Sequence, residues 1–457
     1  MVHQLLAAVV IGSAGVVAAA ATPFRIELVE EGSGWPVPLV RLRTTHQVGF
    51  VSDNAGVVAI DLPELFGREA WFDLEADGYQ VPPDSFGARG FRTTIAAGGR
   101  HRVALRRTSI ARRLGRLTGA GIYGESQKLG AEATWQESGV FGCDSVQTAV
   151  HRGRLHWVWG DTTLARHPLG IFQSIAATTA PSPLGRPEPP IRLVFDHVRA
   201  ADGQLRGVTG FPGDGPIWLT GLVSLEDARG SPRLVATYAR IRPPLEAVER
   251  GLCTWNDETA TFERHTVVWQ KTADAPREPP LPDGHAVRWR EPDGREWVLC
   301  GDPLPTLRFP ARFEAWADPS TWEVLEPQAA FAPSSGDTPV KPHRGSIAWN
   351  PFRDRWVTVF TESFGTPSAF GEIWYAEARS PLGPWGTAVK ILSHGNYTFY
   401  NPCLRPELCP SDSKILLFEG TYSRQFADRP PATPRHDYNQ VLYRLDLDDA
   451  ALEPARR

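Results

Sequence analysis

Residues 155–163 read LHWVWGDTT, an apolar run that ends at a glycine and an acid. The same layout returns later in the chain, as RLVATYARI from 233, REWVLCGDP from 295, RWVTVFTES from 355 and KILLFEGTY from 414. An apolar stretch and a turn precede each run, and the runs lie roughly 55 to 80 residues apart. Four-stranded propeller blades need about 40 to 50 residues before loops are inserted. The sequence predicts an all-β fold with a five-bladed β-propeller over residues 120–449, while a β-sandwich array or, less favoured by the irregular period, a parallel β-helix stays open.

The residues before these repeats show a different pattern. Between 24 and 107, short β-type runs such as RIELVEE, GVVAIDL and HRVALRR alternate with turn signals, which predicts a small β-sandwich. SDNAG at 52–56 and ADGY at 76–79 resemble stretches of transthyretin-like or carboxypeptidase-regulatory-like modules, and this resemblance implies an accessory domain without chemistry of its own. The arginine-rich residues 108–119 are predicted to be a solvated linker.

Composition and charge narrow the choice of ligand. The formal net charge of -4 gives no field of one sign, so neither nucleic acid nor an anionic membrane is expected as a partner. The chain has 16 Trp and 9 Tyr, whose flat rings suit the apolar faces and hydroxyl edges of sugars. A neutral carbohydrate is the partner that this composition favours.

The amino terminus is predicted to carry an export signal. An apolar run from Leu5 to Ala20 is followed by Thr22 and Pro23, which predicts a signal peptide over residues 1–21 and a secreted or periplasmic protein. An uncleaved hydrophobic anchor is the alternative, because the first residues lack Lys and Arg. No later stretch is long and apolar enough for an integral membrane span in the mature chain. Cys403 and Cys409 flank a short proline-containing loop and are predicted to form a disulfide after export.

Acids at the ends of the predicted strands are the candidates for catalysis. Inner strands of a propeller converge on a central channel, so residues at their entrances share one pocket. Glycoside hydrolysis uses one carboxyl group as a proton donor and a second as base or nucleophile. Asp144 and Asp161 lie at the two ends of one predicted hairpin and are the first choice, with Glu362 and Glu372 next. Each acid taken singly also fits a turn cap.

Two segments resemble known glycosidases. GEIWYAEA at 371–378 followed by SPLGPWG at 380–386 resembles glycoside hydrolase family 43 and its five-bladed relatives. DSVQTAVHRGRLHWVWGDTT at 144–163 is similar to the first blade of an endo-D-arabinanase family from mycobacteria. The second resemblance implies that the two essential acids are Asp144 and Asp161.

The function predicted is that of an exported glycoside hydrolase acting on a poly- or oligosaccharide. A non-catalytic carbohydrate-binding propeller and a polysaccharide lyase with His343 or Tyr400 as base are the alternatives. No cofactor is required by this chemistry, a structural calcium ion is left open, and the absence of Cys/His metal motifs gives zinc no support. The residues expected to contact sugar are polar or aromatic and flank the predicted inner strands: His343, Arg344, Trp349, His394, Asn396, Tyr397, Tyr400, Asn401, Glu419 and Tyr422.

Overall fold

The computed structural model describes residues 22–119, 121–132, 135, 138–171, 173–181, 187–409 and 414–456, with the side chains of 167–171 left out. The predicted signal peptide over 1–21 lies outside the described residues. The described chain is almost entirely β-structure, with one short α-helix, α1 (Phe313–Ala317). The all-β prediction is therefore confirmed. None of the described helices is of a length and apolarity that would take it across a bilayer.

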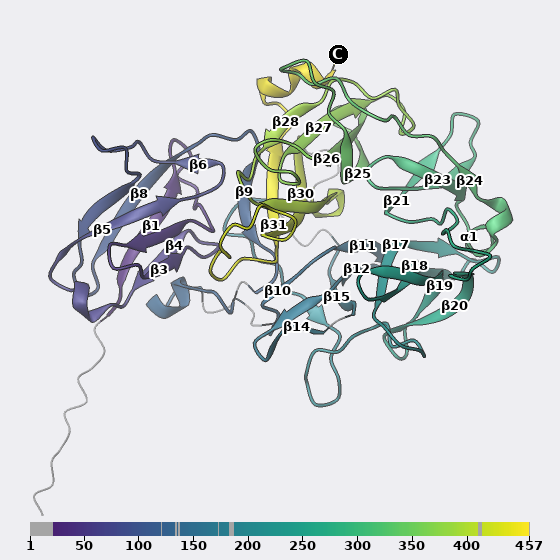
Figure 1. Ribbon diagram of the computed structural model, residues 1–457, viewed down its shortest axis with the longest axis horizontal. Helices are drawn as coiled ribbons and strands as arrows, with labels where there is room; N and C mark the ends of the chain where they lie inside the picture. Colours follow the sequence, from purple (N-terminus) through teal and green to yellow (C-terminus); the bar gives the residue numbers. More distant parts are fainter. Residues whose placement is uncertain are drawn as a thin grey trace, which may run out of the picture.

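Residues 24–107 form two sheets around one hydrophobic core, at the left of Figure 1. One sheet has the order β4 (Val57–Ile60), β1 (Phe24–Glu30), β8 (Arg100–Arg107) and β6 (Tyr79–Gln80). The other has the order β3 (Gly49–Val51), β2 (Arg41–Thr44), β5 (Glu69–Glu75) and β7 (Gly90–Thr94). Alternate residues of β1 and β5 point inward, so Ile26 and Phe72 are fully buried between the sheets.

The rest of the described chain contains five successive four-stranded antiparallel sheets. The first four run in chain order: β11 (Gln147–His151), β12 (Arg154–Trp159), β15 (Ile175–Thr179), β16 (Asp196–His197); β17 (Ile217–Glu226), β18 (Pro232–Arg242), β19 (Glu246–Asn256), β20 (Thr261–Gln270); β21 (His285–Arg290), β22 (Glu296–Gly301), β23 (Pro305–Pro310), β24 (Glu323–Val324); β25 (Pro342–Asn350), β26 (Arg355–Glu362), β27 (Ile373–Ala378), β28 (Val389–Leu392). The fifth joins β29 (Thr398–Leu404), β30 (Ile415–Ser423) and β31 (Asn439–Asp446) to β9 (Arg112–Arg116). The five apolar runs of the sequence are the second strands of these sheets.

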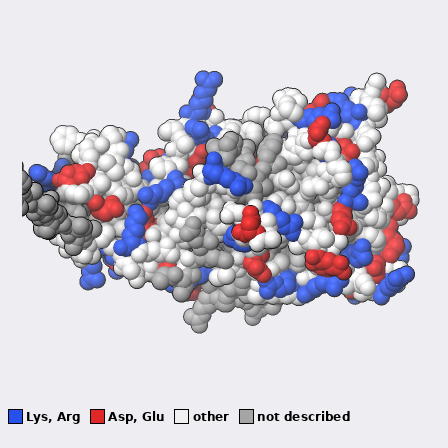
Figure 2. Space-filling view, turned by 90° about the horizontal axis from the view of Figure 1, so that it is seen from below, with Lys and Arg blue, Asp and Glu red and all other residues white. Residues whose placement is uncertain are grey.

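The sheets are arranged around a common centre, as in a propeller (Figure 1). Their first strands are neighbours in sequence order, with β11 beside β17, β17 beside β21, β21 beside β25, and β25 beside β29. Because first and second strands are antiparallel, the starts of the first strands and the ends of the second strands meet at one end of this ring. On the face in Figure 2, acidic and basic side chains are intermixed.

The predicted linker over 108–119 is wrong. Its residues Arg112–Arg116 form β9, which pairs with β31. The last of the five sheets is therefore completed by a strand that precedes the first sheet in the chain. Arg113 and Arg116 are buried, although arginine-rich segments are usually solvated. Their guanidinium groups donate to backbone carbonyls, Arg113 to Pro38 at 3.0 Å and Arg116 to Arg435 at 2.7 Å. These partners come from distant parts of the chain and cannot be inferred from local composition.

Candidate active site

Two short ladders hold Asp144 and Asp161 opposite each other. On one side, β11 pairs with β12 so that Gln147 faces Val158. On the other side, β10 (Gly142–Cys143) pairs with β13 (Thr162–Leu164), a strand that also pairs with β14 (His167–Ile171). Cys143 faces Thr162 in the second ladder, which is the same register as in the first. Extending this register by one residue from Cys143 brings Asp144 opposite Asp161. Directly opposed residues of an antiparallel pair have Cβ atoms about 4.5 to 5.5 Å apart, with side chains on the same face.

Gly160 lets this hairpin close tightly. Its backbone N–H donates to the Asp144 carbonyl at 2.9 Å. A Cβ at this position would lie 2.2 Å from the Asp144 Oδ1 atom, which is closer than real contacts allow. The glycine of the WGDT segment is therefore required by the approach of the Asp144 carboxyl group.

Asp144 lies at the centre of a hydrogen-bond network. The Tyr400 hydroxyl donates to its Oδ2 atom at 3.0 Å. The Tyr438 hydroxyl, the Ser145 side chain and the Asp161 backbone N–H are its further donors among the described residues. Burial raises the pKa of Asp144 to about 6, and these hydrogen bonds act against that rise because they favour the carboxylate.

Asp161 has far fewer partners. It is 7% exposed, and the donor that reaches it in the described structure is the Trp218 indole N–H, 3.2 Å from Oδ1. Burial and the neighbouring charge of Asp144 raise the pKa of Asp161 to about 7. Two carboxyl groups so close cannot both ionise easily, so the pair holds a proton near neutral pH. The difference in donors assigns the ionised form to Asp144 and the proton to Asp161.

Unusual backbone conformations surround the pair. Ser145, Asn401 and Tyr438 have φ angles of 45°, 50° and 58°, in the left-handed region that non-glycine residues seldom occupy. Asn401 sits in an irregularity of the β29–β30 ladder, where its Nδ2 donates to the Ser145 Oγ atom at 2.6 Å. Bulges and left-handed residues of this kind cluster at functional sites, where they aim side chains.

Some predicted sugar contacts do lie at this end of the ring. Tyr400 and Asn401 join the network around Asp144. His343 and Arg344 begin β25, where Arg344 forms an ion pair of 2.7 Å with Asp302. Burial and the charge of Arg344 lower the pKa of His343, so its ring is neutral at pH 7.

The runner-up acids have structural partners. Glu372 is fully buried and forms an ion pair of 2.8 Å with Lys390, while Ser393 donates to it at 2.8 Å. Glu362 accepts from the Trp374 indole at 2.9 Å. The ladder of β26 and β27 also places Glu362 opposite Glu372, and the Glu362 backbone N–H donates to the Glu372 carbonyl at 2.9 Å. This pair differs from Asp144 and Asp161 because the Lys390 ammonium group already neutralises the Glu372 charge.

Several predicted sugar contacts are wrong, because the side chains belong to the interior of the fold. His394 stacks on Phe399 and bonds to the Gly371 carbonyl at 2.9 Å. The other three are held by partners within the fold, because their polar atoms need satisfaction once buried. They are Tyr397 with Asp437 at 3.0 Å, Tyr422 with Asp77 at 2.9 Å, and Glu419 with Arg405 in an ion pair.

Two more predicted contacts lie away from the acid pair or on the surface. Trp349 is at the other end of β25 from His343, about 20 Å along the strand at 3.3 Å per residue, and packs against Trp356. Asn396 is exposed and donates to the Asp428 carbonyl at 3.4 Å.

The predicted disulfide is not formed. Cys403 and Cys409 are free thiols. The Cys403 sulfur lies 3.2 Å from the His285 Nδ1 atom and 2.8 Å from a nitrogen of Arg405. The Cys409 sulfur faces the Arg405 carbonyl instead. The loop between them turns through a short 3-10 helix, Pro406–Leu408, and leaves the two thiols with different neighbours.

Sequence reasoning missed Trp218 and Tyr438, which contact the pair. Trp218 belongs to β17 in the next sheet, and Tyr438 precedes β31 in the last one. Tyr438 stands in the segment HDYNQ, between the polar residues Asp437 and Asn439. An aromatic residue inside a polar loop was the available signal.

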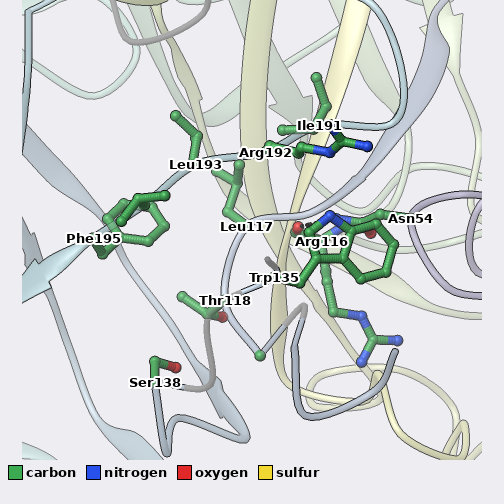
Figure 3. Close-up of a pocket in the computed structure, with 12 residues that line it drawn as sticks. Asn54, Arg116, Leu117, Thr118, Trp135, Ser138, Ile191, Arg192, Leu193 and Phe195 are labelled. Atoms are coloured by element: carbon green, nitrogen blue, oxygen red, sulfur yellow. Dashed lines mark hydrogen bonds between the residues drawn. The ribbon is translucent and has the colours of Figure 1, made fainter. Parts of the chain in front are cut away.

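A small cavity elsewhere in the molecule is not a substrate site. It lies where Asn54 of the N-terminal sheets meets Arg116, Trp135 and Ile191 (Figure 3). Its volume of about 30 Å³ holds about two water molecules and no sugar ring. Within the described residues, no three side chains of His, Cys, Asp or Glu gather in a way that could hold a metal ion.

Comparison with known proteins gives only distant similarities. No family model matches the chain, and no curated protein matches it. An exo-1,5-α-L-arabinanase structure from a bovine ruminal metagenomic library is similar at 11% identity, over 66% of this chain and 92% of that one, with a TM-score of 0.37. An exo-β-1,3-galactanase from Phanerochaete chrysosporium with galactose is similar at 9% identity, over 69% of this chain and 64% of that one, with a TM-score of 0.40. A GH43_1 enzyme from Xanthomonas citri with xylotriose is similar at 8% identity, over 67% and 87% of the two chains, with a TM-score of 0.36. TM-scores below 0.5 support no conclusion about this chain.

Proposed function

We propose that this chain is a glycoside hydrolase that cleaves a poly- or oligosaccharide with Asp144 and Asp161. The observation that carries the proposal is the pair of opposed carboxyl groups with unequal hydrogen-bond partners. Hydrolysis of a glycosidic bond needs one protonated and one ionised carboxyl group at the same pH. The pKa values of about 6 for Asp144 and about 7 for Asp161 meet that need near neutral pH.

The two acids take different roles. Asp161 donates its proton to the glycosidic oxygen as the bond to the leaving group breaks. Its Oδ1 atom accepts from Trp218, so the proton belongs on Oδ2. The Asp144 carboxylate either attacks the anomeric carbon or removes a proton from the water that does so. Tyr400 and Tyr438 hold that carboxylate in place and stabilise its charge.

We further propose that the five four-stranded sheets are the blades of a five-bladed propeller and that the protein is exported. The ring of neighbouring first strands and the last sheet completed by β9 support the first part. The apolar segment from Leu5 to Ala20 supports the second. An accessory role for residues 24–107 stays a prediction from the resemblance to transthyretin-like modules.

A lyase mechanism has less support. Burial and the charge of Asp144 raise the pKa of Tyr400 well above its usual value, so this hydroxyl stays protonated. It donates to Asp144 and is poorly suited to removing a proton from a sugar. His343 is neutral, but its ring lies against Phe370 with centroids 4.6 Å apart.

The test is a polysaccharide panel with four proteins: the wild type, two site variants and one control variant. The wild type should release new reducing ends without the ultraviolet absorbance of an unsaturated product. Asp144→Asn and Asp161→Asn should each lose about 100- to 10,000-fold in rate, the usual contribution of acid-base groups. Asp227→Asn, which alters an exposed turn cap between β17 and β18, is the matched control and should keep full activity. Near wild-type rates in both site variants would refute the assignment.

A further inference from the structure

Three phenylalanines form a continuous aromatic surface beside the acid pair. Phe364 and Phe370 come from the loop between β26 and β27, and Phe426 comes from the loop between β30 and β31. The ring centroids of Phe364 and Phe370 are 5.2 Å apart, and those of Phe370 and Phe426 are 6.5 Å apart. We refer to Phe364, Phe370 and Phe426 as the aromatic shelf.

Two rings of the shelf are exposed, which is unusual for large apolar side chains, while Phe370 is partly buried. Phe364 is 79% exposed and Phe426 is 63% exposed. Both have φ angles in the left-handed region, 57° and 62°, which is rare for bulky side chains. Exposed apolar surface and unfavourable backbone are both costs to the folded chain, and they persist together where they serve a function.

The shelf is continuous with the candidate catalytic centre. The Phe426 ring packs edge-on against Tyr400 with centroids 5.7 Å apart, and the Tyr400 hydroxyl is 3.0 Å from Asp144. On the other side, the neutral His343 ring lies 4.6 Å from Phe370. A chain that leaves the acid pair over Tyr400 therefore meets three uncharged rings.

We propose that the aromatic shelf binds the sugar units that extend from the scissile bond. Resting on the proposed hydrolysis at Asp144 and Asp161, this inference identifies the substrate as an oligomer or polymer long enough to cover the shelf. Sugar rings present C–H faces that pack on aromatic rings, while their hydroxyl edges need polar partners. Arg344, which is exposed next to His343 at the start of β25, is one candidate partner for these hydroxyl groups.

The experiment is native electrophoresis through gels that contain soluble arabinan, galactan or xylan. The full chain is used with Asp161→Asn, so that the polymer is not cut. Phe364→Ala and Phe426→Ala should each weaken retention by about tenfold in apparent affinity, equivalent to about 1.4 kcal/mol. Phe426→Tyr, which keeps the ring, should restore retention. Phe86→Ala is the matched control, because Phe86 is 94% exposed on the N-terminal sheets, between β6 and β7.

The outcomes separate this inference from the proposed function. Retention that is equal in all variants, or no retention by any of the three polymers, overturns the shelf as a sugar site, whatever the hydrolysis assay shows. Weaker retention in the shelf variants without reducing ends from the wild type supports the shelf and refutes hydrolysis. A concentration-dependent dimer that the two alanine variants abolish would show that a second copy of the chain covers the shelf, which also overturns the inference.

Discussion

Asp161→Asn is expected to stabilise the protein while it slows turnover by about 100- to 10,000-fold. Asparagine keeps the oxygen that accepts from the Trp218 indole, and it removes the group whose ionisation is resisted by burial and by Asp144. A turn-capping aspartate would behave in the opposite way, since its loss costs stability. The two interpretations of Asp161 therefore predict stability changes of opposite sign for Asp161→Asn.

The magnitude follows from the pKa of Asp161. Its rise from 3.8 to about 7 means that the folded state binds more protons than the unfolded state between these pH values. The contribution of Asp161 to the free energy of unfolding therefore falls as the pH rises from about 4 to about 7. At 1.36 kcal/mol for each pH unit, the loss reaches about 4 kcal/mol above pH 7 and is absent below about pH 4. Asparagine does not titrate, so the variant escapes this loss.

The assay is thermal unfolding of wild type and Asp161→Asn at pH 4 and pH 8. An unfolding entropy of about 2.1 cal/mol/K per residue gives about 1 kcal/mol/K for 457 residues. The variant should melt up to about 4 °C higher than wild type at pH 8, with the difference disappearing at pH 4. Asp227→Asn should show no such gain, because its carboxylate accepts from the backbone N–H groups of Arg229 and Ser231, which lower its pKa. An unchanged or lower melting temperature of Asp161→Asn at pH 8 would refute the reasoning.

Three further substitutions test Tyr438 beside the acid pair, the runner-up acid Glu372 and the contact of Asn54 with Arg116. Tyr438→Phe removes a donor to Asp144, so the pKa of Asp144 should rise and the acidic limb of the rate profile should move up by about one pH unit, measured from pH 4 to 9. Glu372→Gln breaks the ion pair with Lys390 and should cost about 2 kcal/mol of stability in urea unfolding with an unchanged rate, and a large loss of rate would instead restore Glu372 as a catalytic candidate. Asn54→Ala removes hydrogen bonds to a backbone N–H and a carbonyl and should lower the melting temperature measurably, a prediction that fails if the temperature stays constant.

The sequence predicts the strands of the ring well for a physical reason. Each second strand is a run such as WVLCG or LLFEG, buried on both faces and bounded by a turn, so local pattern is sufficient. Asp144 and Asp161 are predictable for the same reason, because one hairpin sets both positions. Arg113 and Arg116 are not, since their carbonyl partners lie in other segments.

Residues around the acid pair are harder to predict when they come from other sheets. Trp218 and Tyr438 reach Asp161 and Asp144 through the closure of the ring, which no local pattern reports. The reverse error occurred at Tyr397 and Tyr422, which are polar and aromatic but stack on each other inside the fold, with centroids 4.4 Å apart. Residue type identifies candidates for sugar binding, and burial decides among them.

The N-terminal sheets support the segment that carries Tyr438. Asn54 binds the backbone of Arg116 through both atoms of its amide, at 2.9 Å each, and the Arg116 side chain donates to the Arg435 carbonyl at 2.7 Å. Arg435 in turn forms an ion pair with the buried Glu125, whose other oxygen accepts from the Ala59 backbone N–H of β4 at 3.1 Å. Tyr438 lies three residues beyond Arg435 and donates to Asp144. These contacts connect the N-terminal sheets to the segment that carries Tyr438, a hydrogen-bond donor to Asp144.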